Sequence, residues 1–494
     1  MVGLMVLAAC GDNDENLPAG AEPPEFNPGC VNLPGNVDSY SQASDFEPLV
    51  RKTLADWDPT GRWFVTRGRV SYWANLHLER LGKEVVRDRR SQYPGRIDDD
   101  EVFIRQPLVT GDGEPNPITT RISNLRADGS ARIEQAACDT DGCTVCTAVI
   151  ERAAYNAGEG ESDHLSLVGE IALPSDTPVH TVNVRMVGTV AYVVRLDGLF
   201  IVETVDPAHP VVLGSWHRTG DRYSNDVKLV EANGRRYALL ADSPVDVVDV
   251  TDASQAHLVA QVPVEAHTLF TETRDGHTYA YFGALDGTTP VFDISNPEAP
   301  QRLGAFDAKA TYVHDLMVDN GIAYLNAWEE GFKVVDFTNP SQPLQIGEWK
   351  RGLLDENYSH SSWAMHVGGQ TVALHGDENW GAHLNVIDVD PASSRFMKPI
   401  GRYETRTYVS IHNVMAVGTK AYMTYYQDGV RVLDMQEPTR PKLVGYFNSW
   451  DPQGERSTNG FFEGAVGLDV DPIRKLIFVA DTPRGLLILR DETP

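Results

Sequence analysis

A recurring polar position near the start of short apolar segments carries four histidines in this 494-residue chain: His267, His314, His360 and His412. Neutral imidazole is a preferred ligand of Zn, Cu and Fe. Imidazoles from adjacent segments can converge on one divalent metal ion, and Asp315 can then support a ligand from outside the coordination sphere. One interpretation of the pattern is therefore a metal site, with a divalent metal as its cofactor.

The same recurrence supports a structural interpretation of these side chains. Equivalent positions hold His180 and the pair Asn225-Asp226 in other repeats. A metal centre needs only one copy, whereas a residue found in almost every repeat can bond a backbone group of the next repeat each time. Recurrence favours this structural role, and the metal site is the alternative.

Loops that depart from the repeat supply a second group of candidate residues. They carry acidic and aromatic side chains, which can stack on a sugar or hold a cation. The alternative, which has equal support, is that the aromatic rings cover the cores of their own loops. The candidate ligand-binding residues are Trp328, Glu329, Glu330, Asp377, Glu378, Trp380, Tyr425, Trp450, Arg456 and Phe461.

Composition and motifs exclude several classes of function. The 70 Asp and Glu residues outnumber the 42 Lys and Arg residues, giving a formal net charge of −28. Nucleic-acid binding requires clusters of basic residues, so no nucleic-acid partner is expected. No serine-hydrolase elbow, Walker loop or dinucleotide fingerprint occurs in a suitable context. No apolar run approaches the roughly 20 residues of a membrane-spanning helix.

The elements that position these side chains come from an internal repeat of about 44 residues that begins near residue 164. Each period contains four short apolar segments separated by turns, without helical periodicity. Four strands in a period of this length are typical of a β-propeller blade. One segment of each repeat holds a glycine, at Gly169, Gly214, Gly304, Gly347, Gly401 and Gly445, with Ala260 in the third place of the series.

The ends of the repeat region predict how the propeller closes. Residues 165–172 form an outer strand without its blade, and residues 485–490 form a third strand without an outer partner. Pairing the two removes exposed strand edges. We therefore predict an all-β fold, in which residues 164–494 form a seven-bladed β-propeller of four-stranded blades and the strand at about 165–172 completes the last blade.

The repeat region resembles the LVIVD-repeat family. The similarity is carried by His314-Asp315-Leu316, Ala191-Tyr192-Val193, Ala421-Tyr422, the segment Gly331–Asp336 and Leu443-Val444-Gly445. It covers about two thirds of the chain. The resemblance implies a propeller that is often secreted or displayed at the cell surface, and it implies no single activity.

The N-terminus resembles that of a bacterial lipoprotein. Leu7-Ala8-Ala9-Cys10 is similar to a lipobox, in which Cys10 carries the lipid, although the apolar stretch is short and no basic residues precede it. A start site placed too late would account for both departures, and an ordinary apolar N-terminus is the alternative. Residues 1–10 are thus expected to be a signal remnant. Gly11 favours the outer membrane or the cell surface.

Between this N-terminus and the propeller we expect a tether and a small domain. Residues 11–43 are rich in Pro, Gly, Asn and Asp and predict a disordered tether. Residues 44–163 predict a small mixed or β-rich domain, with a short helix after Ser44 and an acidic hinge at residues 157–163. Two disulfides, of undetermined pairing, are predicted in preference to a zinc or cluster site, from Cys30, Cys138, Cys143 and Cys146.

These observations predict a cell-surface or periplasmic lipoprotein whose propeller is a binding scaffold. Its expected partners are the membrane, through the lipid on Cys10, and a protein or carbohydrate ligand on the loop-rich face. The alternative function is a metal-dependent oxidoreductase or hydrolase that uses the histidines at the mouth of the channel.

Overall fold

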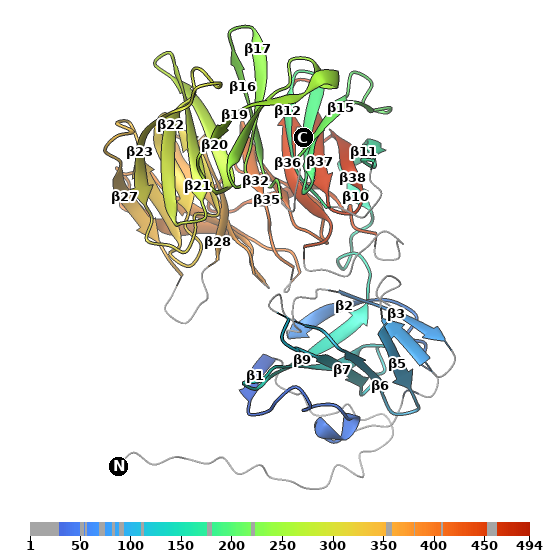
Figure 1. The fold of residues 1–494 in the computed structure, drawn as a ribbon. Helices are drawn as coiled ribbons and strands as arrows, with labels where there is room; N and C mark the ends of the chain where they lie inside the picture. Colours follow the sequence, from blue (N-terminus) through green and yellow to red (C-terminus); the bar gives the residue numbers. More distant parts are fainter. Residues whose placement is uncertain are drawn as a thin grey trace, which may run out of the picture. The chain divides into compact units, whose positions relative to one another are not determined.

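The computed structural model divides the chain into two compact units, Met1–Ala154 and Tyr155–Pro494 (Figure 1). No helix among the described residues is long and apolar enough to cross a membrane. The structure describes residues 29–49, 54, 57–68, 75–81, 84–87, 93–109, 113–174, 180–218, 223–351, 358–379, 381–406, 409–451 and 462–494. Cys10 and the rest of the predicted lipobox lie outside these ranges.

The N-terminal unit is a nine-stranded antiparallel sheet that curls back on itself, because β9 pairs with both β2 and β8. Its inner face buries an apolar core that includes Trp63, Val65, Ile122 and Ile150. Within the described residues, the helix expected after Ser44 is represented by one 3-10 turn, η2 (Ala43–Asp45), and residues 46–49 are not helical. The strands are β1 (Gly29–Leu33), β2 (Gly61–Gly68), β3 (Asn75–Leu81), β4 (Glu84–Arg87), β5 (Tyr93–Ile97), β6 (Val102–Gln106), β7 (Ile118–Ser123), β8 (Ala131–Cys138) and β9 (Cys143–Arg152).

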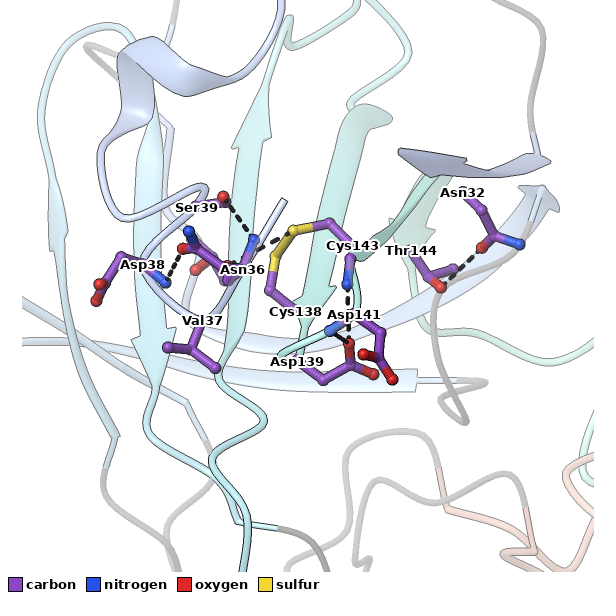
Figure 2. The surroundings of a disulfide bond; sticks show 12 residues. Asn32, Asn36, Val37, Asp38, Ser39, Cys138, Asp139, Asp141, Cys143 and Thr144 are labelled. Carbon is purple, nitrogen blue, oxygen red and sulfur yellow. Dashed lines mark hydrogen bonds between the residues drawn. A yellow bond between two sulfur atoms is a disulfide. The ribbon is translucent and has the colours of Figure 1, made fainter. Parts of the chain in front are cut away.

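Two disulfides fix the edges of this sheet. Cys30 is bonded to Cys146, and these residues lie opposite each other in the β1–β9 pair. Cys138 is bonded to Cys143 across the β8–β9 hairpin (Figure 2). All four predicted cysteines are therefore in disulfides, and the zinc alternative is wrong. The tether prediction is also wrong for residues 29–33, because backbone pairing and a disulfide hold β1 in the sheet.

The second unit is a propeller of seven blades, each with four antiparallel strands (Figure 1). This confirms the predicted fold class. A single 3-10 turn, η3 (Ala253–Gln255), follows β18. Blade one comprises β12 (Thr181–Val187), β13 (Val190–Arg195), β14 (Gly198–Glu203) and β15 (Val211–His217). Blade two comprises β16 (Val227–Ala232), β17 (Arg235–Leu240), β18 (Val245–Asp249) and β19 (His257–Val262). Blade three comprises β20 (Ala266–Arg274), β21 (His277–Ala284), β22 (Thr288–Asp293) and β23 (Gln301–Asp307).

The remaining blades follow the same order from the innermost strand outwards, except that the outer strand of blade seven comes from the start of the unit. Blades four to seven are β24 (Asp315–Asp319), β25 (Ile322–Asn326), β26 (Phe332–Asp336) and β27 (Leu344–Trp349); β28 (Ser359–Val367), β29 (Gln370–Asp377), β30 (Leu384–Asp388) and β31 (Lys398–Tyr403); β32 (Val414–Val417), β33 (Lys420–Thr424), β34 (Val430–Asp434) and β35 (Lys442–Phe447); and β36 (Ala465–Asp471), β37 (Leu476–Asp481), β38 (Gly485–Asp491) and β11 (Leu165–Ile171).

The predicted closure of the ring is present in blade seven. Strand β11 pairs antiparallel with β38, with a register from Leu165 opposite Asp491 to Ile171 opposite Leu486. In Figure 1 the teal strand β11 lies beside the red strand β38. Hydrogen bonds between β11, near the start of the unit, and β38, its last strand, thus seal the ring.

Packing between blades explains why glycine recurs in the outer strands. A Cβ atom added at Gly304 would lie 2.2 Å from the carbonyl oxygen of Pro340, in the turn that precedes the outer strand of the next blade. At Gly214 it would lie 1.8 Å from the carbonyl oxygen of Ala253. The outer strand of one blade therefore contacts the backbone of its neighbour, and glycine keeps that approach open.

The segment predicted as an acidic hinge is packed against blade six instead. Strand β10 (Ser162–Asp163) pairs with β35, which gives this blade a fifth strand. Just before it, the Glu159 carboxylate lies 2.7 Å from the guanidinium of the fully buried Arg431. The carbonyl of Gly160 accepts a hydrogen bond from Asn448 Nδ2. Polar pairing with the propeller fixes this segment, which is not a hinge.

Candidate functional site

The candidate site is a cavity of about 450 Å³ where the innermost strands of the propeller begin. Each predicted histidine lies at the start of, or just before, an innermost strand: His267 in β20, His314 before β24, His360 in β28 and His412 before β32. All four line the cavity, as does His180 from blade one. The sequence repeat therefore converges at one end of the channel.

The four predicted metal-ligating histidines form a row of rings in contact across blades three to six. The ring centroids of His267 and His314 are 4.2 Å apart, those of His314 and His360 are 4.0 Å apart, and those of His360 and His412 are 4.4 Å apart. Side chains from neighbouring blades are thus close enough to act together.

The two nitrogens of an imidazole in this row have different surroundings. Nδ1 of His360 lies 3.2 Å from the carbonyl oxygen of His412, and Nδ1 of His412 lies 2.7 Å from that of Val466. A carbonyl oxygen can only accept a hydrogen bond, so each Nδ1 carries a proton and donates a hydrogen bond to the next blade. In a neutral ring, Nε2 then keeps its lone pair. The backbone bonds of the structural interpretation are present, and they leave Nε2 available.

Glu378 approaches these Nε2 atoms from the loop that follows β29. Its Oε2 lies 4.0 Å from Nε2 of His314 and 3.7 Å from Nε2 of His360. Its Oε1 lies 3.8 Å from Nε2 of His412 and accepts a hydrogen bond from the hydroxyl of Tyr426. Ligand atoms of His314, His360 and Glu378 all lie within 4.8 Å of one another. These three side chains could hold a metal ion.

Burial keeps the imidazoles neutral. It lowers the pKa of His360 and of His412 to about 3 each, with a further contribution from neighbouring histidines. Burial, together with the adjacent His360, lowers the pKa of His314 well below its usual value. Burial also raises the pKa of Tyr426 far above 10, so its hydroxyl stays protonated and donates to Glu378. Neutral imidazole is the form that binds metals.

Aromatic rings form the walls of the cavity. The indole of Trp328 is stacked on His314, with centroids 5.1 Å apart and an angle of 18° between the planes. Tyr312 and Tyr358 each contact that indole, at 5.2 and 5.1 Å. On blade six, Tyr426 lies 4.9 Å from His412, and it contacts Phe462 at 5.9 Å. The cavity thus combines aromatic faces, neutral imidazoles and one carboxylate.

Trp328 and Tyr426 occupy equivalent positions in blades four and six, and both have unusual backbone conformations. Their φ angles are 36° and 37°, in the left-handed region that bulky residues rarely adopt. The carbonyl of each residue accepts a hydrogen bond from the first residue of the innermost strand of the next blade. That residue is Ser359 for Trp328 and Ala465 for Tyr426. Such conformations cost of order 1–3 kcal/mol and cluster at functional sites. Both aromatic side chains line the cavity.

The predicted rim residues divide into two groups. Trp328 and Glu378 line the cavity, whereas the other described residues of this group contact their own surroundings. Glu329 accepts hydrogen bonds from Thr311, and Glu330 is paired with Lys350. Asp377, Tyr425 and Trp450 are buried: Asp377 lies 2.7 Å from Arg351, Tyr425 donates to the carbonyl of Tyr403, and Trp450 donates to Glu463. Trp380, Arg456 and Phe461 lie outside the described residues.

Asp315 lies deeper in the channel, in a second group of charged residues. Its Oδ1 accepts the backbone N–H of Leu316, and burial beside Asp226 raises its pKa to about 7. Asp226 forms a buried pair with Lys228 and accepts hydrogen bonds from Asn183 and Leu269. Asp226 therefore cross-links blades one to three. Within the described part of the chain, the side chain of Asp315 bonds to Leu316 and not to an imidazole, so its predicted supporting role stays a prediction.

Sequence reasoning missed Tyr312 and the association of Glu378 with the histidines. Tyr312 lies in a loop, where no repeat predicts its direction. The equivalence of Trp328 and Tyr426 is visible in the sequence, because each precedes a glycine by three residues, at Gly331 and Gly429.

Comparison with known proteins identifies the repeat. The LVIVD repeat model matches residues 310–350, which contain all of blade four, and this confirms the predicted resemblance. No curated protein matches this chain. The crystal structure of Chaetomium thermophilum Raptor is 12% identical over 65% of this chain, with a TM-score of 0.49, and this chain covers 29% of Raptor. The structure of U3-55K is 7% identical over 68% of this chain and 100% of its own, with a TM-score of 0.48.

Proposed function

We propose that this chain is an extracytoplasmic binding protein whose propeller holds a positively charged ligand, either an ion or an organic cation, in the cavity at the mouth of its channel. A propeller with an LVIVD repeat suits a binding scaffold, and two disulfides are typical of proteins outside the cytoplasm. The observation that carries the proposal is the Glu378 carboxylate, which lines the aromatic cavity and is only 10% exposed.

The chemistry of the cavity favours a cation over a neutral or anionic ligand. The recorded ion-pair partners of Glu378 within the described part of the chain are imidazoles, which burial keeps neutral. A buried carboxylate without a compensating charge costs several kcal/mol, which a bound cation would offset. The faces of aromatic rings such as Trp328 also attract cations. A volume of about 450 Å³ lies within the range of small-ligand sites.

A panel of small ligands tests this function. Metal-free full-length protein would be titrated with tetramethylammonium, choline, Ca²⁺ and Zn²⁺, and with the neutral compounds 3,3-dimethylbutanol and glucose, followed by calorimetry. At least one cation should bind, and Glu378→Gln should weaken it by about 10-fold or more, because the substitution removes the charge and keeps an acceptor for Tyr426.

Glu330→Gln is the matched control, since Glu330 is paired with Lys350 away from the cavity wall. It should leave binding unchanged. Binding of a neutral compound in preference to every cation, or cation binding that is the same in Glu378→Gln, would contradict the proposed function.

We further propose that a lipid on Cys10 anchors the protein to the outer membrane or the cell surface. Support comes from Leu7-Ala8-Ala9-Cys10 and from the disulfides. In a bacterial host fed with labelled palmitate, the full chain should incorporate label and fractionate with membranes. Cys10→Ser should lose both properties. Equal labelling of the two proteins, or absence of label from the wild type in a host that labels a control lipoprotein, would refute the anchor.

The predicted alternative, a metal-dependent oxidoreductase or hydrolase, depends on the same cavity. It requires a bound metal ion before any reaction can be assigned. The positions of the Nε2 atoms are relevant to this requirement for a bound metal ion.

A further inference from the structure

We propose that the cation is a divalent transition-metal ion, bound by Nε2 of His314, Nε2 of His360 and Oε2 of Glu378. This inference rests on the proposed function, since it names the kind of cation that the cavity takes. It differs from the metal site predicted from the sequence because Glu378 is a ligand and because His267 and His412 are not. His267 lies at one end of the row of rings, beside His314.

The distances between candidate ligand atoms are close to those of a metal centre. Bonds of 2.0–2.1 Å in tetrahedral geometry place ligand atoms about 3.3 Å apart. Oε2 of Glu378 lies 3.7 Å from Nε2 of His360 and 4.0 Å from Nε2 of His314, and one ligand atom from each of the three side chains lies within 4.8 Å of the other two. Side-chain movements of about an ångström or less would bring them to bonding positions around one ion.

The surroundings of His360 match those of a metal-bound imidazole. Metal-ligating histidines usually donate their other ring N–H to a carbonyl or carboxylate, which fixes the ring and directs the free nitrogen. Nδ1 of His360 has this contact with the carbonyl oxygen of His412. Its Nε2 is buried and has no hydrogen-bond partner, although the residue is only 1% exposed. A buried polar atom without a partner costs about 1–3 kcal/mol, and a metal bond at Nε2 would remove that cost.

The donor atoms select the class of metal. Two imidazoles and one carboxylate suit Zn²⁺, Cu²⁺, Ni²⁺ or Co²⁺, whereas Ca²⁺ and Mg²⁺ prefer sets made entirely of oxygen. Cu⁺ and iron–sulfur clusters require sulfur ligands, and the four described cysteines are in disulfides. Three protein ligands leave a coordination position that a water or a further ligand can take. The cavity lined by Trp328 and Tyr426 supplies space for such a group.

The decisive experiment measures metal binding by the full chain after dialysis against a chelator. Co²⁺ titration followed by visible absorption, and Zn²⁺ titration by calorimetry, should each give one ion per chain. His360→Asn is the critical variant, because Asn keeps a donor near the position of Nδ1 and lacks Nε2. It should retain the bond to His412 and lower metal affinity by about 100-fold or more, and Glu378→Gln should do the same.

His366→Asn is the matched control. His366 lies on the same strand, β28, with a side chain 68% exposed, so its replacement should leave metal affinity unchanged. Near-ultraviolet circular dichroism would verify the fold of each variant. X-ray absorption at the zinc edge of the wild-type protein keeps the inference testable even if a variant fails to fold, because it should report two imidazoles and one carboxylate.

Three results would overturn the inference: absence of Co²⁺ and Zn²⁺ binding by folded wild-type protein, unchanged affinity in folded His360→Asn, or a zinc-edge spectrum without imidazole. Binding of tetramethylammonium or Ca²⁺ that depends on Glu378, without transition-metal binding, would refute the metal site alone and leave the proposed function intact. Failure of every cation in the panel would refute both.

Discussion

A single imidazole can serve the propeller and bind a ligand at the same time. In His360 and His412 the Nδ1 atom donates to a carbonyl of the next blade, while Nε2 faces Glu378. From the sequence, these two roles are alternatives, because recurrence in the repeats accounts fully for the first. The structure assigns them to different nitrogens of the same ring. Recurrence of a histidine is therefore not evidence against a ligand site.

The positions of the histidines were predictable, whereas the position of Glu378 among them was not. The histidines follow the repeat, so their place at the start of the innermost strands can be counted from the sequence. Glu378 lies after β29 in a loop that departs from the repeat. The direction of its side chain depends on contacts such as the hydrogen bond that its backbone N–H donates to the carbonyl of Tyr358. A sequence repeat thus predicts the positions of residues that recur in each blade. The orientation of a residue in a non-repeating loop depends on three-dimensional packing.

The recurring glycine of the outer strands yields a prediction at the same scale. In Gly304→Ala the new Cβ would lie 2.2 Å from the carbonyl oxygen of Pro340 and 3.0 Å from Cα of Ser341. Both atoms belong to backbone, so the two blades must move apart. We expect a loss of about 1–3 kcal/mol in the free energy of unfolding, measured by denaturant titration.

Gly160→Ala is the control for Gly304→Ala. A Cβ at this position would meet no atom within 4 Å, so stability should change by less than about 0.5 kcal/mol. Equal stability of the two variants would show that close approach of the blades does not explain the glycine.

Among the elements, strands with an apolar core face were predictable and short polar strands were not. The third strands of the blades, such as β22 and β34, stand out in the sequence as apolar segments that end in Asp. In contrast, β1 (Gly29–Leu33) and β10 (Ser162–Asp163) are largely exposed. They form because partners far along the chain, β9 and β35, offer free edges. Composition alone assigns such segments to a tether or a hinge.

At the scale of the whole molecule, the number of blades and their closure could be counted because both depend on the repeat. Seven third strands and seven outer strands require one pairing between the ends of the unit, and β11 with β38 is that pairing. His180 of blade one and Val466 of blade seven line the cavity together with the histidines of blades three to six, so its complete wall requires the closed ring. The fold of the N-terminal unit has no repeat, and its sheet order could not be derived.

Because the pairing of β11 with β38 closes the ring, we predict that a substitution in this pair destabilises blades far from it. Leu165 is 2% exposed in β11 and packs in the core between blades six and seven, with Tyr422 and Leu487 among its neighbours. Leu165→Asp buries a charge there, and we expect it to lower the stability of the propeller by at least about 3 kcal/mol. Leu167, on the same strand, is 39% exposed, so Leu167→Asp is the matched control and should have little effect.

Hydrogen exchange read by mass spectrometry distinguishes a cooperative ring from independent blades. If closure stabilises the ring as one unit, amides of blade three, in β20 to β23, should exchange faster in Leu165→Asp together with those of blade seven, because the slowest exchange reports global unfolding. If only β11 and β36 to β38 lose protection, the blades are stable individually. In that case the pairing of β11 with β38 would contribute to blade seven alone, and the row of histidines on blades three to six would persist without closure.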